Sequence, residues 1–154
     1  MRNFRLTVFV MAVATILAAT ACKKEECSIH PDAFRFSLVG AESGSDLLAA
    51  GVYNTTGIGI YYLLNGQRND LIVNIEPEPD GELVEMVSAQ LPMISLTGRS
   101  DIFYLVLNES ETDTLNVVVE LERRDGCNYH PYTLVMHNGK SLPIVEGKAF
   151  ILEK

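Results

Sequence analysis

The sequence predicts an all-β domain, an antiparallel β-sandwich. From residue 34 onwards, apolar residues tend to alternate with polar ones, which is the period of a strand with one buried face. Gly, Pro, Asn, Asp and Ser bound these short segments, and no long segment shows a helical period. An α/β fold needs helices between parallel strands, so the main alternative to the sandwich is a small β-barrel.

The first strands follow directly from this alternation. Apolar residues alternate over 34–38, 58–64 and 71–75, and Asn65-Gly66 separates the second stretch from the third. Asn-Gly favours the tight turn that joins two antiparallel strands, because both of its residues accept positive φ angles. We therefore expect a hairpin made by the second and third stretches.

The later strands follow an acidic, proline-containing turn. Glu76-Pro77-Glu78-Pro79-Asp80-Gly81 interrupts the sheet, since proline fixes φ and lacks an amide donor. Further short apolar segments cover 83–87, 102–107, 115–121, 132–137 and 149–152. Together with the first stretches, they predict about eight strands.

The N-terminus predicts export and lipid attachment. Arg2 and Arg5 precede an apolar run over 6–17, and small residues then lead to Cys22. The run is shorter than the roughly 18 apolar residues of a membrane-spanning helix, and it fits a cleaved leader. We expect a signal peptide over 1–21, a lipidated tether over 22–32 and a sandwich domain over 33–154.

These segments resemble small envelope lipoproteins of the Bacteroidota. The sequence Ala19-Thr20-Ala21-Cys22 is similar to the lipobox, and Lys23-Lys24-Glu25-Glu26 is similar to the charged tethers of those proteins. The resemblance implies acyl chains on Cys22, an immunoglobulin-like or transthyretin-like sandwich, and a place on the outer membrane or cell surface. Two or three such chains hold a protein stably on a bilayer.

The charge of the chain disfavours nucleic acid as a partner. The formal net charge is −8, and it falls to −10 if Arg2 and Arg5 are removed with the leader. Binding a phosphate backbone needs clustered Lys and Arg, which this sequence lacks.

Two C-x-x-H-P segments are the sharpest local motif. They run from Cys27 to Pro31 and from Cys127 to Pro131. If Cys22 carries lipid, Cys27 and Cys127 remain as a pair that fits a disulfide in an oxidising compartment. The alternatives are unpaired thiols, or a metal site with His30 and His130 as further ligands.

No set of residues predicts catalysis or a cofactor. The acidic turn after residue 76 lacks the spacing of an EF-hand, because its twelfth position is Val87. Glu109, Glu111 and Asp113 fit a solvated hairpin tip, and His137 precedes an Asn-Gly turn. We expect no enzyme activity.

The function expected from the sequence is therefore binding. We expect a lipid-anchored binding or accessory module of the cell envelope, with an envelope protein or a glycan as its partner. Tyr61 and Tyr62 should face opposite sides of a sheet, so one of them is available for such contacts. The alternative function is metal binding through the two C-x-x-H-P segments.

Overall fold

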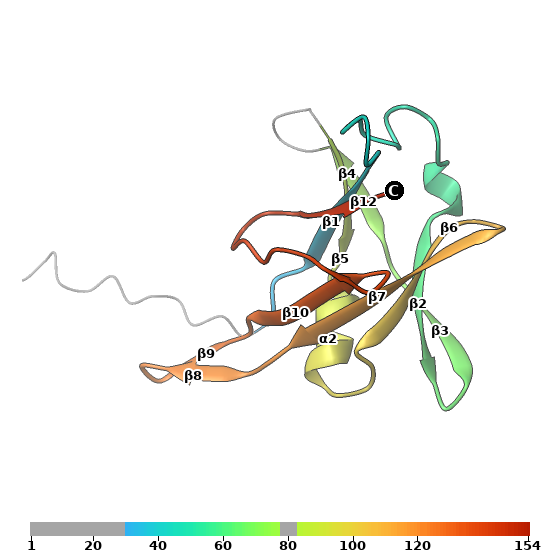
Figure 1. The fold of residues 1–154 in the computed structure, drawn as a ribbon. Coiled ribbons are helices and arrows are strands. Elements are labelled where there is room, and N and C mark those ends of the chain that lie inside the picture. The colour runs from blue at the N-terminus through green and yellow to red at the C-terminus, as the bar shows by residue number, and fades with distance from the viewer. Residues whose placement is uncertain (1–29, 78–82) are drawn as a thin grey trace, which may run out of the picture.

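The protein is an all-β sandwich. The computed structural model describes residues 30–77 and 83–154, and Figure 1 shows their arrangement. The smaller of the two main sheets has four strands in the spatial order β12-β1-β5-β4, with bounds β12 (Phe150–Glu153), β1 (Phe34–Val39), β5 (Val84–Ser88) and β4 (Asn74–Pro77).

The larger sheet faces the first and has six strands. Their spatial order is β11-β10-β7-β6-β2-β3, with bounds β11 (Lys140–Ser141), β10 (Tyr132–His137), β7 (Glu111–Val119), β6 (Ile102–Asn108), β2 (Gly59–Leu64) and β3 (Gln67–Leu71). Every pairing in this sheet is antiparallel.

Three short elements complete the described part. Strands β8 (Glu122–Arg124) and β9 (Cys127–Tyr129) form a hairpin that projects from the body (Figure 1). The helix α2 (Gln90–Leu96) links β5 to β6, and η1 (Thr55–Gly57) precedes β2. None of the helices in the described ranges is long and apolar enough to cross a membrane.

One apolar core lies between the two sheets. Alternate residues of β6 and β7 are buried, as a strand with one inward face requires. Burying each large apolar side chain contributes about 1.5–3 kcal/mol. The largest fully buried side chains come from both sheets and from α2: Phe34, Phe36, Phe103, Leu38, Ile60, Met86, Leu91, Leu105, Leu107, Leu115, Leu152 and Val117.

The predicted sandwich is confirmed, and the barrel alternative is wrong because no described sheet closes on itself. The predicted turn is also confirmed, since β2 and β3 pair around Asn65 and Gly66, both at positive φ, but the returning strand is Gln67–Leu71 and not 71–75. One pair departs from the antiparallel prediction: β12 lies parallel to β1. A parallel neighbour is possible because β12 is the last strand and reaches the edge by a long connection.

The third predicted stretch, 71–75, is divided between the sheets. Leu71 ends β3 in the larger sheet, whereas Ile75 lies in β4 of the smaller one. The chain crosses between them at Ile72, whose backbone N–H donates to Oε1 of Gln90 over 2.7 Å. The alternation of apolar and polar residues continues past Ile72. The sequence pattern therefore does not show that the chain leaves one sheet for the other at this point.

Several sequence predictions lie outside the described residues. These are the signal peptide over 1–21, lipidation at Cys22, the tether up to residue 29 including Cys27, and the acidic residues Glu78, Asp80 and Glu82.

Candidate functional site

The His-Pro ends of the two C-x-x-H-P segments line one open groove. Its volume is about 820 Å³, and both His30-Pro31 and His130-Pro131 contribute to its wall. A third wall is the segment 144–148, which connects β11 to β12. Residues 100 positions apart in the sequence are therefore brought together, as the sequence motif suggested.

A tyrosine binds the segment before β1, which lines the groove, to the rest of the domain. The hydroxyl of Tyr132, at the start of β10, donates to the backbone oxygen of Asp32 over 2.7 Å. Its ring packs against Phe34 and Phe150, with centroids 6.0 and 5.6 Å away. Burial raises the pKa of Tyr132 far above its usual value, so the hydroxyl remains a donor.

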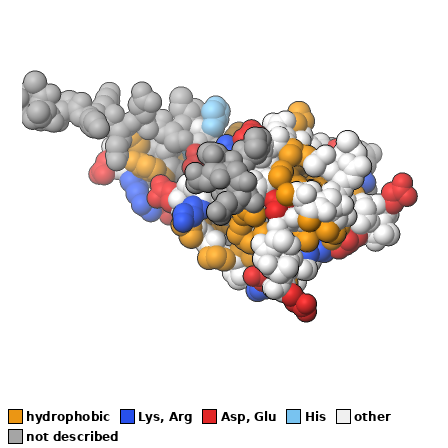
Figure 2. All heavy atoms as spheres, turned by 90° about the horizontal axis from the view of Figure 1, so that it is seen from above, with side chains coloured by type: hydrophobic (Ala, Val, Ile, Leu, Met, Phe, Trp, Pro, Cys, Tyr) orange, Lys and Arg blue, Asp and Glu red, His pale blue; other side chains and the backbone are white. Residues whose placement is uncertain are grey.

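The groove carries charges of both signs beside apolar side chains. Ile144 and Val145 are 44% and 49% exposed. Arg35 is bound to Glu85 at 2.7 Å, and Arg124 is bound to Glu122. Glu146 and Lys148 also line the groove and form no ion pair within the described ranges. Figure 2 shows basic, acidic and hydrophobic side chains interleaved at the narrow end of the molecule, beside the grey residues.

His130 has an unused polar atom. Its Nδ1 is buried and has no hydrogen-bond partner among the described residues. A buried polar group without a partner costs about 1–3 kcal/mol, so this atom lowers the stability of the fold.

The cysteine of the second C-x-x-H-P segment is disulfide-bonded. This is Cys127, in β9. Its expected partner, Cys27, lies outside the described residues, so the pairing of Cys27 with Cys127 stays a prediction. A bonded sulfur does not act as a thiolate ligand, and no group of three or more His, Cys, Asp or Glu in the described part is arranged to hold a metal ion.

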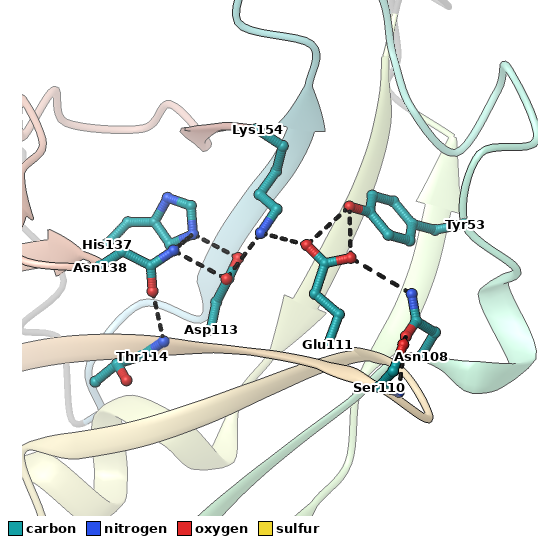
Figure 3. A network of polar contacts seen from close by, with 9 residues as sticks. All are labelled: Tyr53, Asn108, Ser110, Glu111, Asp113, Thr114, His137, Asn138 and Lys154. Atoms are coloured by element: carbon teal, nitrogen blue, oxygen red, sulfur yellow. Dashed lines mark hydrogen bonds and ion pairs between the residues drawn. The ribbon is translucent and has the colours of Figure 1, made fainter.

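A second polar cluster lies at the other end of β10. The Nε2 atom of His137 is 2.8 Å from Oδ2 of Asp113, and the two side chains are only 6% and 5% exposed. Nζ of Lys154 lies 2.8 Å from Oδ1 of Asp113 and 2.6 Å from Oε1 of Glu111. The hydroxyl of Tyr53 donates to Glu111 (Figure 3). We call these five residues the inter-sheet network.

The network joins the two sheets electrostatically. Asp113, Glu111 and His137 belong to the larger sheet, whereas Lys154 directly follows β12 of the smaller one. Burial alone would raise the pKa of Asp113, but hydrogen bonds from Lys154, Asn138 and His137 outweigh it and lower that pKa. The hydrogen bond from Lys154 likewise lowers the pKa of Glu111.

The predictions for this region need correction. Glu111 and Asp113 were expected at a solvated hairpin tip, yet both lie in β7 and Asp113 is buried. His137 ends β10 and precedes the Asn-Gly turn, as expected, but its side chain is buried, with the residue 5% exposed. The alternation of Asp113 with Leu115 and Val117 was the available signal, because it places the carboxylate on the buried face.

Tyr61 and Tyr62 face opposite sides of the sheet, as predicted. Tyr62 is buried, and Tyr61 stacks on Tyr104 with centroids 4.9 Å apart. The guanidinium of Arg68 lies 4.1 Å from the centroid of the Tyr61 ring. Sugar binding by stacking uses an open ring face. The neighbours of Tyr61 therefore favour a packing role over glycan contact.

Comparison with known proteins gives no family for this chain. No family model, no curated protein and no solved structure matches it. The groove and the inter-sheet network are therefore interpreted from their own geometry.

Proposed function

We propose that this protein is a lipid-anchored lipoprotein of the cell envelope that binds another envelope protein in the groove between its two C-x-x-H-P segments. The convergence of these segments on one groove carries the proposal. It supports a site there because His30-Pro31 and His130-Pro131, far apart in the sequence, bring the same residue types to one groove.

The position of the groove relative to the predicted anchor supports the same function. His30 lines the groove and lies eight residues after Cys22. A fully extended chain spans at most about 3.6 Å per residue, so the groove would lie within about 29 Å of the acylated cysteine. A partner bound there would itself be at or near the membrane.

The chemistry of the groove favours a protein as its ligand. Its wall combines exposed Ile144 and Val145 with Glu146 and Lys148, which leaves apolar surface beside charges of both signs. A polypeptide segment offers apolar side chains, backbone hydrogen-bond groups and charges together.

Lipid attachment is tested by labelling cells that produce the full-length chain with radioactive palmitate. We expect label in the wild-type protein and none in a Cys22→Ser variant. Absence of label from the wild type, or a native chain that keeps residues 1–21, would contradict the anchor.

The groove is tested by photo-crosslinking in intact cells. A photoreactive residue at Ile144, in the groove, is compared with one at Ile102, on the outer face of the larger sheet; these isoleucines are 44% and 48% exposed. We expect a defined protein adduct from position 144 only, and its loss when Lys148→Glu is added. Equal adducts from both positions, or an adduct that this charge reversal leaves unchanged, would contradict the groove as the binding site.

A further inference from the structure

The strand β3 is an open sheet edge. It has five residues, contains no proline and, among residues 30–77 and 83–154, pairs on one side only, with β2. The other edges of the two main sheets are obstructed: β4 ends in Pro77, β11 has two residues, and Glu153 of β12 is tied to Lys140 at 2.6 Å. An unobstructed edge is a template for pairing with another strand.

The backbone of β3 shows which residues point outward. The two-residue turn at Asn65-Gly66 makes Leu64 and Gln67 a hydrogen-bonded pair. Since such pairs alternate along an antiparallel ladder, Asn69 and Leu71 also bond to β2. The backbone N–H and C=O groups of Arg68 and Asp70 therefore point to the open edge.

The sequence of this edge is complementary to itself. Arg68 and Asp70 flank Asn69 symmetrically, and both charged side chains are exposed, at 54% and 68%. In a two-fold antiparallel pairing centred on Asn69, each Arg68 lies opposite Asp70 of the other copy. A two-fold interface requires this arrangement, because a residue of one copy that contacts a second residue of the other copy must make the same contact with the copies exchanged.

We infer that two copies of this chain associate through β3, and that their larger sheets join into one continuous sheet. Four backbone hydrogen bonds would form between Arg68 and Asp70 of the two copies, two on each side of the axis. Each Asp70 carboxylate already contacts Arg68 of its own chain at 2.7 Å, and in the pair it would lie between two guanidinium groups.

The local charge favours association of like chains here. The chain has a net charge of −8, which opposes contact between copies in general. By contrast, β3 contains one basic and one acidic residue, so the joined edge is neutral. Tyr61 and Leu63 lie beside Asp70 and Arg68 on the outer face and add uncharged surface next to the pairing. This inference does not depend on the proposed groove or on lipidation.

Charge reversal tests the pairing. The full-length chain, purified in detergent, is examined by sedimentation equilibrium as the wild type, Arg68→Asp, Asp70→Arg and the double variant. Opposite charges across strands stabilise and like charges destabilise a pair. We expect a wild-type dimer, a dissociation constant at least about tenfold higher in each single variant, and recovery in the double variant, where the complementarity is restored.

Crosslinking tests the register independently of affinity. A cysteine at Asn69 lies on the proposed two-fold axis and faces its own copy, whereas a cysteine at Gln67 faces Leu71 of the other chain. We expect mild oxidation to give a covalent dimer with Asn69→Cys and not with Gln67→Cys. A monomeric wild type, a dimer insensitive to both charge reversals, or equal crosslinking at the two positions would overturn the inference.

Discussion

The two ends of β10 use histidine in opposite ways. At its C-terminal end, His137 is buried and bound to Asp113, which also accepts from Asn138 and Lys154. Just before its N-terminal end, His130 lines an open groove and has a buried Nδ1 without a partner among the described residues. The same residue type is satisfied at one end of the strand and incompletely satisfied at the other.

This difference separates a structural region from the proposed binding region. A polar cluster whose members already hydrogen-bond to one another gains little from a ligand. It instead stabilises the packing of the strands to which its residues belong. A groove lined by exposed aliphatic side chains, and by charges without an ion pair among the described residues, can gain free energy from a ligand. We therefore assign the inter-sheet network to stability and the groove to function.

The largest expected effect comes from the covalent link at the groove end. Replacing Cys27 and Cys127 together by serine should lower the free energy of unfolding by about 4 kcal/mol, because a loop of about 100 residues is then no longer closed in the unfolded chain. Urea unfolding followed by circular dichroism measures the change. A loss below about 1 kcal/mol, or peptide mapping that links Cys127 to Cys22, would contradict the proposed pairing.

The next effect comes from the inter-sheet network. Asp113→Asn keeps the shape of the side chain but removes its charge and one of its two acceptor oxygens, so Lys154 and His137 lose the buried carboxylate that they share. We expect a loss of about 3 kcal/mol in the free energy of unfolding, as for a broken buried ion pair. Glu153→Gln is the matched control, because its partner Lys140 is 71% exposed, and it should cost at most about 0.5 kcal/mol. Equal losses in the two variants would show that burial of the network does not matter.

A smaller effect should appear in the pH dependence of stability. Asp113 and Glu111 have ordinary pKa values of 3.8 and 4.5, and both are lowered in the folded protein. Their contribution to the free energy of unfolding is therefore fully present above about pH 5. It is lost as the pH falls through their lowered pKa values in the folded protein. The pKa of Lys154 is raised, so its contribution is lost only in strong alkali, above its ordinary value of 10.5.

The corresponding measurement is the free energy of unfolding between about pH 6 and pH 3, for the wild type and for Asp113→Asn. The wild type should lose stability faster on acidification, because the variant no longer has this carboxylate to protonate. Parallel curves would mean that the network does not contribute to acid sensitivity.

The sequence predicted the strands of the sandwich because a strand with one buried face has apolar residues at every second position. Leu115, Val117 and Val119 alternate with more polar neighbours, and all three are buried in β7. The hairpin at Asn65-Gly66 followed from the φ angles that its turn requires. Both features are local, so they can be recognised without knowing the rest of the fold.

The network escaped prediction because its partners are distant in sequence. Asp113 and Lys154 are 41 positions apart and come from opposite sheets, and neither lies in a recognisable motif. That His30 and His130 line one groove was easier to anticipate, since both belong to C-x-x-H-P motifs. The parallel placement of β12 against β1 had no local signal, because parallel pairing depends on a long connection.

The most direct test of the assignment compares His130→Ala with His137→Ala in urea unfolding of the full-length chain. His137→Ala should lower the free energy of unfolding by about 2 kcal/mol, because buried Asp113 loses a hydrogen-bond partner. His130→Ala should not lower it, since Nδ1 makes no hydrogen bond among the described residues that the substitution would remove. Equal losses, or a larger loss from His130→Ala, would contradict the division between a structural network and a binding groove.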